Sequence, residues 1–129
     1  MNETINNILS RRSVRKYDKR QISDDDLNLL IKSAIYAPSG RNMQTWHLTV
    51  VQSKDLLNEI SEAVAKDRND ETYKPFYDAP TVIFMSGDES SDWMKEDCAA
   101  ATENIMLAAQ SLGIGSCWIG CIRRTLQGP

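Results

Sequence analysis

Residues 97–120 have the sequence DCAAATENIMLAAQSLGIGSCWIG, and this stretch decides the predicted fold. It contains most of a long helix, which we expect over Asp92–Leu112, with Gly113 as the left-handed residue that ends it. The middle of this helix, Cys98–Ala109, is rich in alanine and carries little charge, so we expect it to be buried on several sides. Gly115–Ile119 is short, apolar and bracketed by glycines, and it predicts a strand.

Helices and short strands alternate upstream of this stretch. Ser23 and Ser53 are typical helix N-caps, each followed by apolar residues at helical spacing. Residues 68–78 lack such spacing, and we expect them to be irregular. The predicted elements are helices over Thr4–Leu9, from Ser23 to Ala37 and from Ser53 past Val64, strands over Trp46–Val51 and Thr81–Met85, and at most one helical turn within Ile122–Pro129.

These elements predict an α+β fold with a small, mainly antiparallel sheet flanked by helices. Residues 1–129 contain no repeat, low-complexity tract or linker, so we treat them as a single domain. Three short strands make an incomplete sheet, and we expect another subunit or further sequence to complete it.

Composition and charge exclude several classes of protein. The chain has 129 residues, of which 41% are hydrophobic and 26% charged, as in ordinary globular domains. Its net charge of -3 argues against a dedicated nucleic-acid binder. No apolar run approaches the roughly 20 residues that span a bilayer. Three cysteines are an odd number in a chain of this size, so we expect a reduced, cytoplasmic protein with neither a membrane nor a nucleic acid as partner.

Four polar residues, Arg11, Arg12, Ser13 and Arg15, follow the first predicted helix. Arginine suits phosphate because its planar fork donates two parallel hydrogen bonds and keeps its charge. Arg11, Ser13 and Arg15 alternate, so on an extended segment they would point the same way along one ligand. The alternative is that basic residues end a helix because they complement its dipole.

Two further segments favour a flat ligand. Pro38, Ser39, Gly40, Asn42 and Gln44 form a loop whose two amides suit the edge of a heterocycle, although an ordinary helix-to-strand connection is the alternative. Cys117, Trp118, Ile119 and Gly120 end the predicted third strand, where glycines let the backbone pass close to a ring. No helix with dinucleotide glycine spacing follows. Trp118 is expected to be a core residue first, although a wall of the substrate pocket, or both roles, is the alternative.

Other chemistry has little support. Cys117 and Cys121 have no second cysteine pair, and His47 is not near them in the sequence, so we expect no metal site. His47 is expected to be a packed strand residue, and the acidic residues from Asp88 to Asp97 to be solvated faces and caps. No serine lies in a nucleophile elbow. We therefore predict no catalytic side chain.

In this order, the three segments resemble the nitroreductase family of FMN-dependent flavoproteins. The resemblance lies in RRSVR at 11–15, APSGRNMQTWH at 37–47 and residues 97–120, and it covers nearly the whole chain. It implies an α+β flavoprotein that forms a homodimer with two FMN molecules between the subunits. Members usually continue past the equivalent of Gly128 with a helix, a strand and a basic tail, so we expect this domain to be C-terminally short.

The resemblance also implies a role for each segment. Arg11 is similar to a phosphate ligand, Ser13 to a partner of the ribityl chain or phosphate, and Arg15 to the cation beside the flavin pyrimidine. The 38–42 loop would reach FMN held mainly by the other subunit, and residues 117–120 would lie near the hydride-accepting nitrogen. The predicted cofactor-binding residues are Arg11, Arg12, Ser13, Arg15, Pro38, Ser39, Gly40, Asn42, Gln44, Cys117, Trp118, Ile119 and Gly120.

The implied activity is hydride transfer from NAD(P)H through FMN to a nitroaromatic, quinone or similar acceptor, with ping-pong kinetics. A fixed cation near the pyrimidine would stabilise the negative charge that develops there. Two alternatives remain open: a catalytically impaired FMN-binding or dimerising remnant of the family, and a small nucleotide- or RNA-binding module that uses the arginines.

Overall fold

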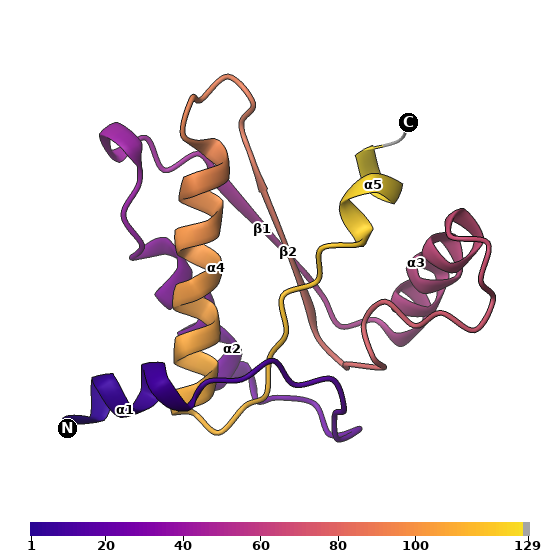
Figure 1. The fold of residues 1–129 in the computed structure, drawn as a ribbon, viewed down its shortest axis with the longest axis horizontal. Coiled ribbons are helices and arrows are strands. Elements are labelled where there is room, and N and C mark those ends of the chain that lie inside the picture. The colour runs from indigo at the N-terminus through magenta and orange to yellow at the C-terminus, as the bar shows by residue number, and fades with distance from the viewer. Residues whose placement is uncertain (128–129) are drawn as a thin grey trace.

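The computed structural model describes residues 1–127. Figure 1 shows helices on both sides of the molecule, with a two-stranded sheet running between them. The elements are α1 (Glu3–Ser10), α2 (Asp24–Ile35), the 3-10 turn η1 (Gly40–Asn42), β1 (Trp46–Val51), α3 (Lys54–Asp67), β2 (Val82–Gly87), α4 (Met94–Ser111) and α5 (Ile122–Gln127).

Most predicted elements are confirmed because local signals set their ends. The Ser23 hydroxyl accepts a hydrogen bond from the Asp26 backbone N–H at 3.1 Å, and the Ser53 hydroxyl accepts one from Leu56 at 3.2 Å. Gly113, with a φ of +73°, ends the long helix as expected. The second helix ends at Ile35, two residues before the predicted end at Ala37.

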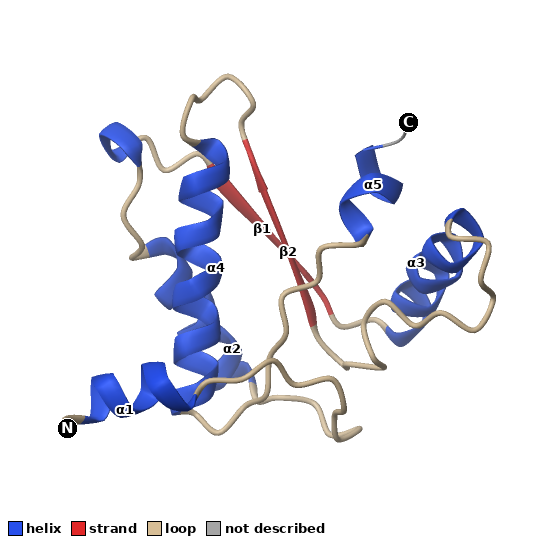
Figure 2. Cartoon of the chain, in the orientation of Figure 1, coloured by secondary structure: helices blue, strands red, loops and turns tan. Residues whose placement is uncertain are grey.

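The sheet contains two strands within the described residues, one fewer than predicted. β1 and β2 pair antiparallel from Trp46 opposite Gly87 to Val51 opposite Val82. The prediction of a strand over Gly115–Ile119 is wrong, because this segment makes only an isolated parallel bridge between Ser13 and Ser116. As Figure 2 shows, it runs as a loop from the end of α4 toward α5.

Helix α4 packs along α2 and also contacts α1 and both strands. Ala34, Ala37 and Ala101 form a buried cluster between α2 and α4, against which Trp46 and Met85 of the sheet pack. The buried positions of α4 are Asp97, Ala101, Met106 and Ala109. The other alanines of its middle are half-buried, so the helix is covered on fewer sides than we expected.

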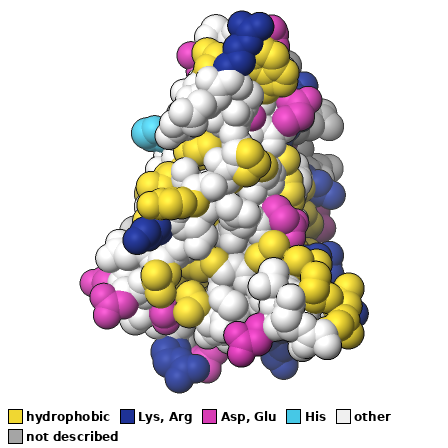
Figure 3. Space-filling model, turned by 90° about the vertical axis from the view of Figure 1, so that its left-hand side faces the viewer, with side chains coloured by type: hydrophobic (Ala, Val, Ile, Leu, Met, Phe, Trp, Pro, Cys, Tyr) yellow, Lys and Arg dark blue, Asp and Glu magenta, His cyan; other side chains and the backbone are white. Residues whose placement is uncertain are grey.

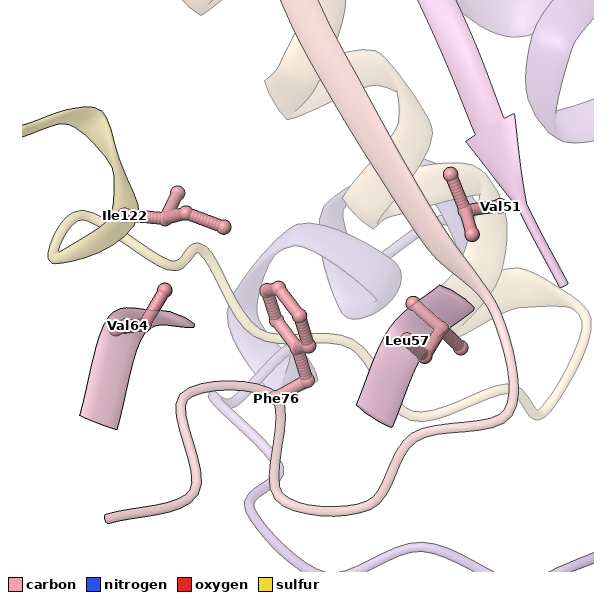
Figure 4. Close-up of a cluster of buried hydrophobic side chains, with 5 residues drawn as sticks. All are labelled: Val51, Leu57, Val64, Phe76 and Ile122. Carbon is pink, nitrogen blue, oxygen red and sulfur yellow. The ribbon is translucent and has the colours of Figure 1, made fainter. Parts of the chain in front are cut away.

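A second core lies between α3, α5 and the ends of the two strands. Val51, Leu57, Val64, Phe76 and Ile122 are buried together, and Figure 4 shows their side chains converging from four parts of the chain. The ring of Phe76 also meets that of Phe84 edge to face, with centroids 6.0 Å apart. Residues 68–78, predicted to be irregular, lie outside the helices and strands and supply Phe76 to this core.

No helix in the part of the chain that the structure describes is long and apolar enough to cross a bilayer. Helix α1 leaves its apolar face largely uncovered, since Ile5, Ile8 and Leu9 are 41%, 47% and 56% exposed. Polar contacts attach this helix to α4: the Asn7 side chain donates to the Leu107 carbonyl at 2.8 Å, and Gln110 donates to the Ser10 hydroxyl at 3.1 Å.

The second core yields a stability prediction. Phe76→Ala removes a ring that is 5% exposed, so we expect the free energy of unfolding to fall by about 3–5 kcal/mol. Leu56→Ala, at an exposed position of α3, serves as the control and should cost under about 1 kcal/mol. Chemical denaturation followed by circular dichroism measures both changes. Equal losses in the two variants would contradict this description of the core.

Candidate functional site

The 11–15 and 113–120 segments lie side by side. The Val14 backbone N–H donates to the Ser116 carbonyl at 2.9 Å, which joins the two segments through the Ser13–Ser116 bridge. Gly115 is required for this approach, because a Cβ there would lie 2.9 Å from Cγ1 of Val14. The close backbone approach expected at this glycine is therefore made to Val14. By contrast, a Cβ at Gly120 would meet nothing within 4 Å.

Arg11 has more donors than the described chain satisfies. Its side chain is 25% exposed, and its Nε lies 3.8 Å from Oε1 of Glu103 on α4. Its Nη1 is buried and has no hydrogen-bond partner among the described residues. A guanidinium carries five N–H donors, and a buried donor without a partner is costly. This side chain is therefore suited to an additional anionic acceptor.

Arg12 has a different environment. Its Nη1 donates to the carbonyls of Leu9 and Arg11, each at 2.8 Å, at the C-terminal end of α1. This is the helix-end role that the sequence left open as an alternative for the basic residues. The side chains of Ser13 and Arg15 are exposed beyond it.

Tyr17, which the sequence analysis did not single out, folds back onto the 11–15 segment. Its hydroxyl donates to the Val14 carbonyl at 2.5 Å. The pKa of Tyr17 is raised to about 12, chiefly by burial and then by the nearby Cys117, while the positive charge of Arg15 opposes the rise. Tyr17 is therefore close to members of both segments. The sequence signal that could have identified Tyr17 is an aromatic residue two positions after Arg15, at the same alternate spacing as Arg11, Ser13 and Arg15.

The 38–44 segment packs on the first turn of α4. The Gly40 N–H donates to Oδ1 of Asp97 at 2.9 Å, and a Cβ on Gly40 would lie 2.7 Å from the Trp93 side chain. The Arg41 guanidinium lies 5.1 Å from the centroid of the Trp93 ring. The glycine is thus needed for contact with Trp93 in this chain.

This segment has an unusual backbone. Arg41, Asn42 and Gln44 have φ values of +53°, +55° and +54°, in the left-handed region that non-glycine residues rarely adopt. The Gln44 side chain donates to Oδ1 of Asn42 at 2.9 Å, and the Gln44 N–H donates to the Ser39 hydroxyl at 3.2 Å. Strained backbone of this kind is concentrated at functional sites.

The 38–44 segment does not meet the other two segments within one chain. The 38–44 segment lies beside Asp97 at the start of α4, whereas the 11–15 segment follows α1, which is bonded to Gln110 near its end. These positions are 13 residues apart, or about 20 Å along the helix axis. In Figure 1, η1 and α1 accordingly lie at opposite ends of α4.

Some buried polar atoms have no hydrogen-bond partner, and they lie in the segments selected from the sequence or in residues packed against those segments. Among the described residues, they are Nη1 of Arg11, Oγ1 of Thr45 and Oδ2 of Asp97. Asp97 is 4% exposed, so the expectation that it lies on a solvated face is wrong. Asp97 is buried because it lies beneath Gly40. The many acidic residues around it in the sequence gave no sign of this burial.

Other expectations have mixed outcomes. Trp118 is 53% exposed, so the expectation that it is a core residue is wrong within this chain. His47 is exposed on β1 and not packed as expected, because the strand directs it away from α4. Among the residues that the structure describes, no three metal-binding side chains come together. Burial, followed by the charge of Asp97, raises the pKa of Cys98, which does not favour a reactive thiolate.

Comparison with known proteins identifies relatives along almost the whole chain. The sequence model of the nitroreductase family matches residues 8–125. An Archaeoglobus fulgidus protein, provisionally named an NADH dehydrogenase/NAD(P)H nitroreductase, is 42% identical over 127 residues, which cover 96% of this chain and 71% of that protein. An FMN reductase (NADPH) of Bacillus subtilis is 26% identical over 143 residues, covering 98% of this chain and 57% of the relative.

Solved structures show the same fold. A nitroreductase with bound FMN from Bacteroides fragilis superposes with a TM-score of 0.89 at 40% identity, over 98% of this chain and 79% of that one. An FMN-dependent nitroreductase from Clostridium difficile gives 0.85 at 51% identity, over 92% and 61% of the two chains. The predicted α+β fold class is therefore confirmed, and this chain spans three-fifths to four-fifths of these solved relatives.

The partly buried hydroxyl of Tyr17 yields a pH prediction. Its pKa of about 12 lies above the value of 10.0 expected in the unfolded chain, so its stabilising contribution is complete below pH 10 and is lost as pH rises through 12. We expect Tyr17→Phe to have a shallower loss of stability than the wild type over this interval, and to lack one late step in an ultraviolet tyrosinate titration. Unchanged profiles for both would show that Tyr17 is solvated.

Proposed function

The chain belongs to the nitroreductase family, as its three segments predicted, and we propose that it is an FMN-dependent oxidoreductase that uses NAD(P)H. The acceptor is a nitroaromatic, a quinone or a similar compound. The observation that carries this proposal is the buried Nη1 of Arg11, which has no hydrogen-bond partner among the described residues. Arg11 lies two positions before Ser13, where the 11–15 segment is bridged to Ser116. The relatives named as NAD(P)H nitroreductase and FMN reductase, and the solved neighbours with FMN, agree with it.

Arg11 and Ser13 would hold the phosphate end of FMN. Glu103 lies by Nε of Arg11, which leaves Nη1 as the donor for an anion. A charged donor and a phosphate oxygen form a short, strong hydrogen bond, and the exposed Ser13 hydroxyl supplies a second polar group nearby. Because Arg12 donates to backbone carbonyls, we assign it to α1 and not to the cofactor.

Arg15 and residues 117–120 would line the ring. When bound, FMN supplies the chemistry of accepting and donating a hydride. Arg15 would place a fixed positive charge at the pyrimidine edge, where negative charge develops during transfer. Tyr17, bonded to the Val14 carbonyl and close to Arg15 and Cys117, keeps this part of the backbone in place. The side of Gly120 on which no atom lies within 4 Å leaves room for a ring beside this segment.

A second copy of this chain would complete each site. The 38–44 segment lies about 20 Å along α4 from the Arg11 end, so in one subunit it cannot reach the same cofactor. We assign its Pro38, Ser39, Gly40, Asn42 and Gln44 to the FMN held by the partner subunit. The uncovered apolar face of α1 agrees with a homodimer. Figure 3 shows apolar side chains exposed on this side of the molecule.

Arg11 and Arg12 provide a matched test of the phosphate site. Arg11→Met should raise the Kd for FMN about tenfold to a hundredfold, because a charged hydrogen bond to phosphate is lost. Arg12→Met removes an equal charge one residue away and should leave the Kd within about threefold of the wild type. Fluorescence titration of FMN measures both. Equal weakening would mean that general positive charge, and not the Arg11 geometry, binds the phosphate.

Turnover tests the activity itself. The FMN-loaded protein should oxidise NADH or NADPH in the presence of a quinone or nitroaromatic, with parallel double-reciprocal plots. Arg15→Leu should slow flavin reduction about a hundredfold, as expected for loss of a charge that stabilises transfer. Lys16→Leu, at the neighbouring exposed position, is the control. If the FMN-saturated chain oxidised neither nucleotide with any acceptor, a flavin-binding or dimerising relative without turnover would remain.

A further inference from the structure

A buried carboxylate lies beneath the 38–44 segment. Asp97 is in the first turns of α4, is 4% exposed, and accepts a hydrogen bond from the Gly40 N–H at 2.9 Å, across 57 positions of sequence. Its other oxygen, Oδ2, is buried and has no hydrogen-bond partner among the described residues. We propose that Asp97 is a positioning residue, which holds the 38–44 segment in the shape in which it reaches the cofactor.

The segment needs an anchor outside itself. Three of its residues, Arg41, Asn42 and Gln44, have left-handed backbone angles that L-amino acids disfavour. Its internal hydrogen bonds, from Asn42 N–H to the Ser39 carbonyl at 3.0 Å and from Gln44 N–H to the Ser39 hydroxyl at 3.2 Å, close the turn without attaching it to the rest of the molecule. Such a turn keeps its shape only where its surroundings determine it.

The start of α4 supplies that anchor. Asp97 bonds Gly40, and the Trp93 side chain packs against Gly40 and lies beneath the Arg41 guanidinium. The two α4 residues are fixed relative to each other, because the Asp97 N–H donates to the Trp93 carbonyl at 2.9 Å. The contact to Gly40 therefore transmits the rigid position of the helix to the loop.

The burial of Asp97 separates this role from an ordinary helix-end charge. Glu96, its neighbour, also lies in the acidic first turn of α4 but is exposed to solvent. Either carboxylate interacts favourably with the helix dipole, but only a side chain under the loop can accept from Gly40. A carboxylate with an unpartnered oxygen is costly to bury. Its presence is explained if a side-chain acceptor oxygen is needed at this position to hold Gly40.

Three variants test the proposal. Asp97→Leu keeps the approximate size and removes the acceptor, Asp97→Asn keeps an acceptor oxygen for Gly40, and Glu96→Gln removes a neighbouring charge as the control. In the FMN-free protein, NMR measures amide hydrogen exchange at Gly40. We expect about tenfold faster exchange or more in Asp97→Leu, partial protection in Asp97→Asn, and no change in Glu96→Gln.

FMN affinity gives the second readout, and here the inference rests on the proposed function. Asp97→Leu should raise the Kd for FMN about tenfold or more, whereas Asp97→Asn should stay within about threefold of the wild type. This rescue by asparagine separates positioning of Gly40 from a need for the negative charge. Thermal unfolding, recorded for every variant, separates both effects from general destabilisation.

Each outcome decides a different question. Wild-type exchange at Gly40 and wild-type FMN affinity in Asp97→Leu would overturn the positioning role. If the wild type itself binds no FMN, the proposed function fails, and Gly40 exchange alone decides the inference. Asp97→Ala replaces Asp97→Leu if the leucine variant does not fold. If neither folds, Asp97 is required for folding, and the positioning role is overturned.

Discussion

The close packing of α2 against α4 is the contact on which the rest of the structure depends. Ala34 and Ala101 are fully buried where the two helices meet, and their small side chains allow the helices to approach closely. This contact fixes α4 relative to β1 and β2, whose Trp46 and Met85 pack against it. The 38–44 segment is attached to the start of α4. The 11–15 segment follows α1, which is bonded to the end of α4, and the 113–120 segment continues from that end.

The length of α4 therefore governs the proposed site. Its first turns hold the 38–44 segment through Trp93 and Asp97. Its last turns hold α1 through Leu107 and Gln110, and Gly113 then turns the chain so that Ser116 meets Val14. A rigid helix separates the two groups, so neither can move to the other without breaking the core. Assembly of two chains is the simplest way to unite them around one ligand.

The sequence predicted those features that local signals determine. Trp46–Val51 has the predicted bounds, the Ser23 and Ser53 caps are formed, and Gly113 ends α4. It could not predict features that depend on distant neighbours. Gly115–Ile119 has the composition of a strand, but within the described residues it makes only the isolated Ser13–Ser116 bridge. Likewise, nothing local shows that Asp97 is buried beneath Gly40, or that Arg12 bonds carbonyls while Arg11 keeps a free donor.

The central claim is that each FMN site takes residues from two chains, and mixing two defective variants tests it most directly. Arg11→Met disables the phosphate end, and Gly40→Val displaces the loop, since its side chain would clash with Trp93. In a mixed dimer, one site carries both defects and the other carries none. The account predicts that unfolding and refolding the two variants together restores tight FMN binding that neither shows alone. No restoration in a mixture shown to contain mixed dimers would contradict it.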